Sequence, residues 1–414
     1  MVGKSTKDNL EPGGYPDCAK VGNVTVPPCA FVDDVKLMAP NDHSLRNAGH
    51  KVTTSLDYLG LSANPSKTTV IVFGKGKKAN NMRQRLEASP VIIQGNEIKV
   101  VSADTYLGVK ISQAGVKDSI KMTFEERKSK AWNKVFAFKK MLRHPAMQRN
   151  GHIKSAVGMF RAVIIPTLLY SAECWFGITK GMLNNIEKVY KKMIYSLLDI
   201  PTKTKYFAVM SELGLKQARH IIAAQKLNFV NNIAKRDNDN VTVRVLNEDH
   251  RLHGDKSILT EVRELCESYN LPDIWNSPCD DDTIKTRVEE ENYMQYWKGC
   301  LLSNIVICRQ RLKTDFKPYH LWPRSDGRSV LLWRCGALRF RSRWRKFNKK
   351  NKMDTSCPHP LCPADDNLDH ALKCLFMDSK IRGKTDYDIQ DDRMCSFLVA
   401  LNRERSRRYD APIL

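Results

Sequence analysis

A chain of 414 residues with 42% apolar residues has room for two to four globular domains. Its 68 Lys and Arg residues exceed its 45 Asp and Glu residues, which gives a formal net charge of +23. An excess of this size predicts a polyanionic partner, and nucleic acid is the most common one. The alternative is a basic surface that only faces water.

The sequence argues against secretion and against insertion into a membrane. No apolar core follows the first lysine, so a signal peptide is not expected. The most apolar stretch, residues 162–178, is interrupted by Pro166 and Glu173 and is expected to be buried core. Twelve cysteines without a secretory signal predict free thiols in a reducing compartment inside the cell, either nuclear or cytoplasmic.

An acidic pair, Asp33-Asp34, lies between two short β-prone runs at residues 24–30 and 35–39. This pattern predicts a β-hairpin with both carboxylates at its tip. Two carboxylates a few ångströms apart repel each other, and a divalent cation such as Mg2+ is the simplest partner that stabilises both as anions. Asp is also common in turns for local reasons, so the pair alone does not establish a metal site.

The next sixty residues contain further motifs in a defined order. Each motif alone is weak evidence for a particular fold, and the ordered set is more specific than any single motif. The predicted elements are a helix over 44–60, a Gly-Leu-x-x-Asn-x-x-Lys-Thr entry at 60–68 into a buried strand over 70–73, a hairpin over 91–101 with its turn at 94–96, and a Tyr-Leu-Gly turn at 106–108.

This ordered set resembles the palm of the reverse transcriptases of non-LTR retrotransposons. The resemblance implies an RNA-directed DNA polymerase that acts on an RNA template and a DNA primer or target by two-metal nucleotidyl transfer. Asp33 and Asp34 match the Mg2+ ligands of that family's hairpin, and Lys67 matches a lysine near the phosphates of the incoming nucleotide. The turn that positions the primer end is matched by Tyr106, Leu107 and Gly108. Val32 stands where the family more often has Ala.

Two parts of that family pattern are missing. The third metal ligand, in a stretch resembling Phe-x-x-Asp-x-x-x-Ala-Phe, and a nucleotide-binding loop resembling Gln-Gly-x-x-x-Ser-Pro should both precede Phe31, and neither is found there. We therefore expect a C-terminal part of a reverse transcriptase that does not polymerise alone, since positioning supplies most of the catalysis in phosphoryl transfer. An upstream polymerase half is a candidate partner, and Mg2+ is expected at the hairpin only together with this missing half of the palm.

Residues 119–236 predict three basic amphipathic helices. The first has an apolar face that includes Val135, Phe136 and Met141, the second covers 183–198 and ends before Pro201, and the third covers 218–234. Helices of this kind after a palm resemble a polymerase thumb, which grips the template–primer duplex through its phosphates. In that interpretation the duplex is bound by Lys134, Lys139 and Lys140. A plain helical bundle with solvated lysines is the alternative.

The C-terminal region combines basic and aromatic residues with a candidate zinc site. Interleaved rings and charges are typical of nucleic-acid binding, here by Arg339, Arg341, Arg343, Trp344, Arg345 and Lys346. Three thiolates and one imidazole can form a tetrahedral Zn2+ site, and the candidate ligands are Cys357, Cys362, His370 and Cys374. The set resembles the zinc knuckle near the C-terminus of many non-LTR reverse transcriptases. Ordinary thiols in a loop are the alternative.

The sequence thus predicts an α+β protein: a partial palm of antiparallel hairpins plus a helix, a mainly helical thumb and connector, and a small zinc module. An irregular connector with two short helices, at 260–269 and 286–297, is expected over about 236–300. A non-catalytic, zinc-containing nucleic-acid-binding protein derived from such an element is the alternative, and a two-metal nuclease ranks third. The predicted parts are a disordered segment (1–22), palm (23–115), thumb (116–240), connector (241–330), basic stretch with knuckle (331–378) and tail (379–414).

Overall fold

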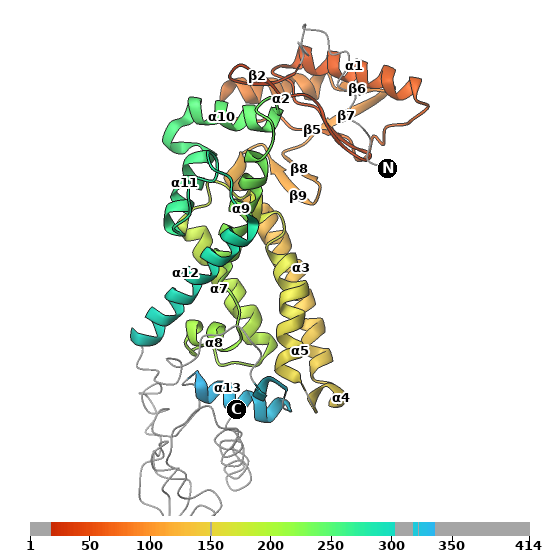
Figure 1. The fold of residues 1–414 in the computed structure, drawn as a ribbon. Helices are drawn as coiled ribbons and strands as arrows, with labels where there is room; N and C mark the ends of the chain where they lie inside the picture. The colour runs from red at the N-terminus through yellow and green to blue at the C-terminus, as the bar shows by residue number, and fades with distance from the viewer. Residues whose placement is uncertain (1–17, 150, 303–317, 322, 336–414) are drawn as a thin grey trace, which may run out of the picture. The chain divides into compact units, whose positions relative to one another are not determined.

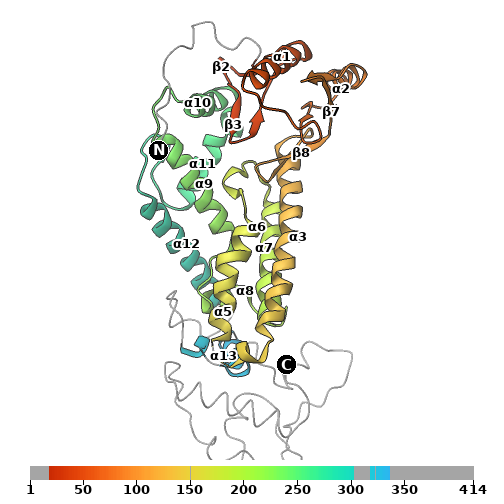
Figure 2. The ribbon, with the colours of Figure 1, turned by 90° about the vertical axis from the view of Figure 1, so that its right-hand side faces the viewer.

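The computed structural model describes residues 18–149, 151–302, 318–321 and 323–335. Helices predominate, and the strands form small sheets (Figure 1 and Figure 2). The predicted α+β class is confirmed, whereas the assignment to a palm and a thumb stays a prediction. The chain divides into two compact units, each built from segments distant in sequence. The first combines 1–127, 169–183 and 222–288, and the second combines 128–168, 184–221 and 289–414.

All the described strands belong to the first unit. β5 pairs with β7 in parallel, and the other pairings are antiparallel: β1 with β2, β3 with β4, β6 with β7, and β8 with β9. The strands are β1 (Lys20–Val21), β2 (Val24–Thr25), β3 (Cys29–Phe31), β4 (Asp34–Lys36), β5 (Thr69–Val70), β6 (Val91–Ile93), β7 (Asn96–Val100), β8 (Ala103–Tyr106) and β9 (Val109–Ser112).

Helix α1 (Asp42–Tyr58) confirms the predicted helix and its end signal. The Asn41 side chain caps it by accepting a hydrogen bond from the Ser44 amide, and the chain turns away at Gly60, whose φ is 65°. α1 packs on β6, where Gly49 permits close approach because a Cβ there would lie 3.1 Å from Val91 Cγ1. The small core beneath it is formed by Leu86 of α2 (Lys77–Ala88), Val91 and Ile98.

The hairpin predicted over 91–101 is confirmed, with Ile93 opposite Asn96 and the two turn residues between them. The buried strand predicted over 70–73 is wrong: β5 contains only Thr69–Val70, and Phe73 is 58% exposed. β5 pairs only with β7, and the apolar run after it has no second sheet layer to pack on in the part of the chain described. A run of apolar residues was therefore insufficient to predict a buried strand here.

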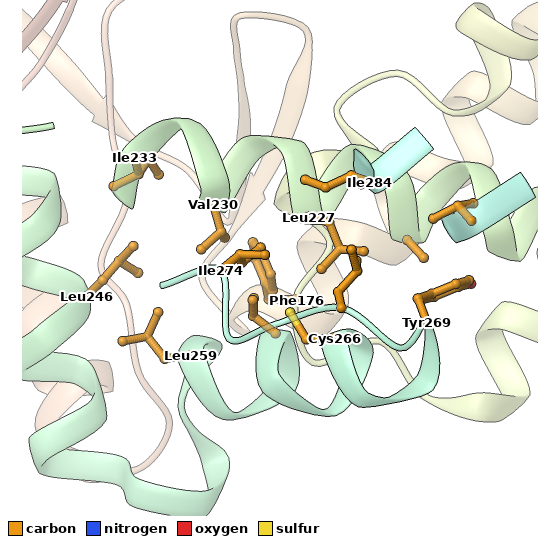
Figure 3. Close-up of a cluster of buried hydrophobic side chains, with 14 of the residues drawn as sticks. Phe176, Leu227, Val230, Ile233, Leu246, Leu259, Cys266, Tyr269, Ile274 and Ile284 are labelled. Carbon is orange, nitrogen blue, oxygen red and sulfur yellow. The ribbon is translucent and has the colours of Figure 1, made fainter. Parts of the chain in front are cut away.

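The larger core of the first unit lies between helices (Figure 3). It includes Phe176, Leu227 and Val230, and it extends through Val262 and Ile284. The helices around it are α9 (Ala218–Ala234), α10 (Val241–His253), α11 (Ile258–Ser268) and the start of α12 (Asp281–Leu302), with 3-10 turns η2 (Ala172–Cys174) and η3 (Gly254–Lys256).

The connector predicted over 236–300 is only partly correct. The two short helices predicted within it are confirmed as α11 and as part of α12, but α10 was not expected and the region is mainly helical rather than irregular. Apolar residues of these helices and of α9 share one buried cluster, which the pattern within each segment does not report.

The second unit is helical throughout its described residues. The apolar face predicted for residues 183–198 is confirmed on α7, where Ile186, Met193 and Ile194 are fully buried. Its elements are most of α3 (Val116–Leu142), α4 (Pro145–Gln148), α5 (His152–Met159), a π-turn η1 (Phe160–Ile164), α6 (Ile165–Leu168), α7 (Lys180–Leu197), α8 (Tyr206–Glu212), η5 (Pro318–Leu321) and α13 (Arg324–Arg334).

The single apolar face predicted for α3 is only partly correct. Val135 and Leu142 are buried, but Phe136 is 60% exposed and Met141 is 41% exposed. The Phe136 ring stacks on Trp132 one turn earlier, with centroids 5.5 Å apart. The buried stripe of α3 is thus narrower than the spacing of apolar residues suggests. None of the described helices is long and apolar enough to cross a bilayer.

Asp199 connects three segments of the second unit. It follows α7 with a φ of 52°, a conformation that Asp tolerates better than most residues. Its carboxylate pairs with Lys139 at 2.6 Å, with Arg143 at 3.5 Å, and with Arg324. Burial raises the pKa of Asp199, but these three cations lower it more, so the net pKa lies below the ordinary value of 3.8.

We expect Asp199→Asn to lower the free energy of unfolding at pH 7 by about 2 kcal/mol, because hydrogen bonds to a charged group are lost. Asn keeps the left-handed preference, so the backbone is not an added variable. Because the folded pKa is depressed, this stability is present above the unfolded pKa and is lost as the pH falls through the folded pKa.

The test is urea unfolding at pH 7 and at about pH 3, where the difference between wild type and variant should shrink. Asp239→Asn removes an exposed carboxylate and serves as the control. A difference that stays constant with pH would contradict the role of the Asp199 charge.

Candidate functional site

The acidic pair lies at the tip of the β3–β4 hairpin, as predicted, but the first arm is shorter than the predicted run 24–30: it covers only Cys29–Phe31, and Val24–Thr25 pairs with β1 instead. The strands pair with Phe31 opposite Asp34, so Val32 and Asp33 form a two-residue turn. Asp33 lies in the turn and Asp34 is the first residue of β4, and both are exposed. The hairpin tip therefore presents two adjacent carboxylates to solvent.

The turn that carries the pair has an unusual backbone conformation at Val32. Its φ is 56°, which is rare for a β-branched residue, and its side chain is 90% exposed and buries nothing in exchange. Asp33 does not share the positive φ, so the turn is of the II′ kind, which normally has Gly at its first position. Conformational strain at such a point is typical of functional sites.

The two carboxylates have the chemistry of a partial Mg2+ site. Neither carboxylate takes part in a hydrogen bond or an ion pair with the residues that the structure describes. Hard carboxylate oxygens suit Mg2+, which completes its shell with water and phosphate oxygens. Among the described residues, no group of three or more His, Cys, Asp or Glu side chains is placed to hold a metal ion. Asp33 and Asp34 therefore fit as two ligands of a shell that needs others.

The hairpin is connected to β8 through Lys36. Its ammonium group lies 3.9 Å from the Asp104 carboxylate and 5.1 Å from the centroid of the Tyr106 ring. Asp104 also accepts a hydrogen bond from the Thr69 hydroxyl at 2.5 Å. Burial raises the pKa of Asp104. The hydrogen bonds from Thr69 and Thr105 and the charge of Lys36 lower it by more, so the net pKa lies below the ordinary value and the carboxyl stays ionised.

The Tyr-Leu-Gly turn joins β8 to β9, as its sequence predicts. Tyr106 pairs with Val109, and the two residues between them both have positive φ, 47° at Leu107 and 76° at Gly108. This is the I′ turn geometry that matches the twist of a two-stranded hairpin. Leu107 remains 38% exposed at the tip.

Two side chains from distant segments hold this turn. The Tyr170 hydroxyl donates to the Leu107 carbonyl at 2.9 Å, and Arg127 donates to the Gly108 carbonyl at 2.6 Å. The Arg127 guanidinium also lies over the Tyr170 ring, 4.1 Å from its centroid. We call these two residues, with the two carbonyls they bind, the turn clamp.

Gly108 is required by the turn clamp as well as by its φ. A Cβ at this position would lie 2.5 Å from Nη2 of Arg127 and 3.2 Å from Cε1 of Tyr170. A side chain here would therefore displace both clamp residues. Sequence reasoning identified the glycine but not its neighbours.

Lys67 is exposed on the loop that leads into β5. Asn64 shapes this loop: its side chain accepts hydrogen bonds from the amide and the hydroxyl of Ser66, and its carbonyl accepts from the Lys67 amide at 3.1 Å. The Gly-Leu-x-x-Asn-x-x-Lys-Thr pattern thus has a local structural role. Placement of Lys67 near an incoming nucleotide stays a prediction.

The predicted lysines of α3 are not equivalent. Lys134 donates to the Thr167 hydroxyl at 2.9 Å and Lys139 pairs with Asp199, whereas Lys140 is exposed. Lys139 therefore has a structural partner that its spacing did not indicate. The remaining predicted residues lie outside the part of the chain that the structure describes: Arg339, Arg341, Arg343, Trp344, Arg345, Lys346, Cys357, Cys362, His370 and Cys374.

Sequence reasoning missed Asp104, Arg127 and Tyr170. Tyr170 lies within the stretch 162–178, which the sequence predicts only to be buried core, and Arg127 lies in a helix rich in charged residues. No local pattern marks these residues, because each acts on a partner at least 19 positions away. Comparison with family models, with curated proteins and with solved structures finds no match for this chain.

We expect Val32→Gly to stabilise the β3–β4 hairpin. Gly adopts the positive φ without the penalty of about 1–2 kcal/mol for an L residue, and its own entropic cost is about 0.5–1 kcal/mol. The net gain predicts roughly two- to fivefold slower amide hydrogen exchange in the hairpin. Val35→Gly, at an exposed position within β4, is the matched control and should speed exchange. Faster exchange in Val32→Gly would contradict the proposed strain.

Proposed function

We propose that this chain is the C-terminal part of a reverse transcriptase of the non-LTR retrotransposon type. The proposal assigns the β3–β4 hairpin and the 106–108 turn to the palm, and α3, α7 and α9 to the thumb. The observation that carries it is the hairpin tip, where Asp33 and Asp34 are consecutive, exposed and without a partner among the residues that the structure describes. The ordered motifs from residue 31 to residue 109 support it from the sequence.

In this proposal Asp33 and Asp34 hold Mg2+ together with the phosphates of the bound substrate. When bound, the metal ions activate the primer 3′-hydroxyl and stabilise the leaving pyrophosphate. The two carboxylates orient and neutralise the ions, and the exposed ammonium of Lys67 offers its charge to the phosphates. The 106–108 turn contacts the primer strand.

A third carboxylate is needed to complete such a metal site. No stretch ahead of Phe31 matches the third-ligand pattern, and the described residues place no third acid with the pair. We propose that this ligand comes from an upstream polymerase half and that the chain alone binds a template–primer without extending it. Synthesis of DNA on an RNA template by the purified chain with Mg2+ would contradict this part of the proposal.

We expect the chain to bind an RNA–DNA template–primer with an affinity that falls steeply with salt. About six phosphate contacts would reduce it roughly 10^3-fold between 50 and 200 mM salt. Fluorescence anisotropy measures this, and Asp33→Asn should leave it nearly unchanged because the carboxylate contributes no phosphate contact. Weak binding that does not depend on salt would contradict the proposal.

Metal binding separates the polymerase-derived site from the alternative, a non-catalytic nucleic-acid-binding protein. We expect Mn2+, used as a paramagnetic substitute for Mg2+, to broaden the NMR signals of the 31–36 hairpin in the duplex complex only at high Mn2+ concentration, because two carboxylates without the third ligand bind the ion weakly. Asp33→Asn should abolish the broadening. Glu87→Gln removes another exposed carboxylate of the same unit and should not. Duplex binding without metal binding at the hairpin would favour the alternative.

The candidate knuckle is proposed to hold zinc through Cys357, Cys362, His370 and Cys374. We expect about one zinc ion per chain by elemental analysis, because three thiolates and an imidazole close a tetrahedral site. Cys374→Ser should lower this content. Cys279→Ser, at a free cysteine of the first unit, should not. Equal zinc content in the two variants would contradict the site.

A further inference from the structure

We propose that Arg127 and Tyr170 are positioning residues for the primer 3′ end, which they act on through the Tyr-Leu-Gly turn. This inference rests on the proposed function and extends it to two residues that no motif marks. Neither residue needs to touch the reacting atoms. Their role is to hold the turn in one conformation and to set its charge.

The turn clamp restrains the tip of the hairpin at both of its exposed carbonyls. Two-residue hairpin loops usually leave such carbonyls to water, and a two-stranded hairpin is only marginally stable alone. Here the Leu107 carbonyl accepts from Tyr170 and the Gly108 carbonyl accepts from Arg127. The second is a charge-assisted hydrogen bond, which is about twice as strong as a neutral one. The tip is therefore restrained by side chains from two other segments.

Both clamp residues are themselves held in place. Arg127 stacks on Tyr170, so each side chain limits the rotamers of the other. Ser171 follows Tyr170 with a φ of 62°, and its hydroxyl donates to the Tyr170 carbonyl at 2.5 Å. Tyr170 thus lies on a turned segment with a defined backbone, where its ring is 42% exposed.

Strand β9 is fastened to the same helix that carries Arg127. The Lys110 amide donates to the Thr123 hydroxyl at 2.9 Å, and the Ser112 amide donates to the Ser119 hydroxyl at 2.9 Å. The Ser112 hydroxyl donates in turn to the Asp118 carboxylate at 2.6 Å. The first turns of α3 and the turn clamp therefore hold the hairpin along its length.

The clamp changes what the tip can bind. Two donors occupy the carbonyl lone pairs that would repel a phosphate, and the Arg127 guanidinium brings a positive charge to the turn. Two further cations lie on this side of the unit, although each is shared with an acid: Lys110 with Glu126 at 3.6 Å, and Lys36 with Asp104 at 3.9 Å. The sugar–phosphate backbone at a primer end is a ligand of matching charge.

The test compares two duplexes that share a backbone and differ only at the primer end. One has a recessed 3′ end on an RNA template, and the other is blunt. We expect wild type to prefer the recessed end. Tyr170→Phe removes one hydrogen bond and keeps the ring, and Arg127→Lys keeps the charge but loses the planar fork. Each should reduce the preference roughly tenfold while the affinity for the blunt duplex changes less than about twofold.

The matched controls are Tyr58→Phe and Arg85→Lys, which make the same chemical changes on the surface of the first unit. Amide hydrogen exchange at residues 107–109 reports on the clamp without nucleic acid, and it should accelerate in the clamp variants alone. If exchange accelerates but the preference is retained, the clamp is only structural and the inference is overturned.

The wild-type result separates this inference from the function on which it rests. Duplex binding with no preference for the recessed end would overturn the positioning role and leave the proposed function standing. Failure to bind either duplex would overturn the proposed function, and the positioning role would fall with it.

Discussion

The repulsion between two adjacent carboxylates is the constraint on which the candidate site depends. Asp33 and Asp34 are consecutive residues, and a regular strand would direct their side chains to opposite faces. The II′ turn at Val32 places Asp33 in the turn and Asp34 at the start of β4, so the two residues do not lie within one regular strand. The chain adopts an unfavourable φ at an exposed valine for that arrangement, and no buried contact at Val32 offsets the cost.

Local patterns predicted the elements that local chemistry determines. The hairpin at residues 31–34, the turns at 94–95 and 107–108, and the buried face of α7 follow from alternation, turn residues and helical spacing, and each is confirmed. The prediction of a buried strand at 70–73 was wrong because burial depends on what packs against the strand. The pattern of residues within one strand does not report this. The predicted burial of Phe136 and Met141 was wrong for the same reason. Helical spacing does not specify how wide a stripe of the helix its neighbours cover.

Long-range partners could not be predicted from the sequence. Tyr170 lies 63 residues from the carbonyl it binds, and Lys139 lies 60 positions from Asp199. The two units also interleave along the chain, so that segments distant in sequence complete the core of a single unit. The predicted palm, thumb and connector are successive segments of the sequence. A division of this kind assumes contiguous domains, so it cannot predict contacts between segments that are distant in sequence.

Several acids of the chain have structural roles, which their cations and hydrogen-bond donors make evident. Asp199 has three cationic partners, Asp104 has a lysine and a hydroxyl, and Glu248 pairs with Arg251 and the Asn23 amide. Asp33 and Asp34 have none among the described residues, although the chain carries a net charge of +23. Lys36 lies on the same hairpin, and its ammonium pairs with Asp104 instead. Within the described part of the chain, no ion pair has to break before a cation binds these two carboxylates, so none of its binding energy is lost to such a step.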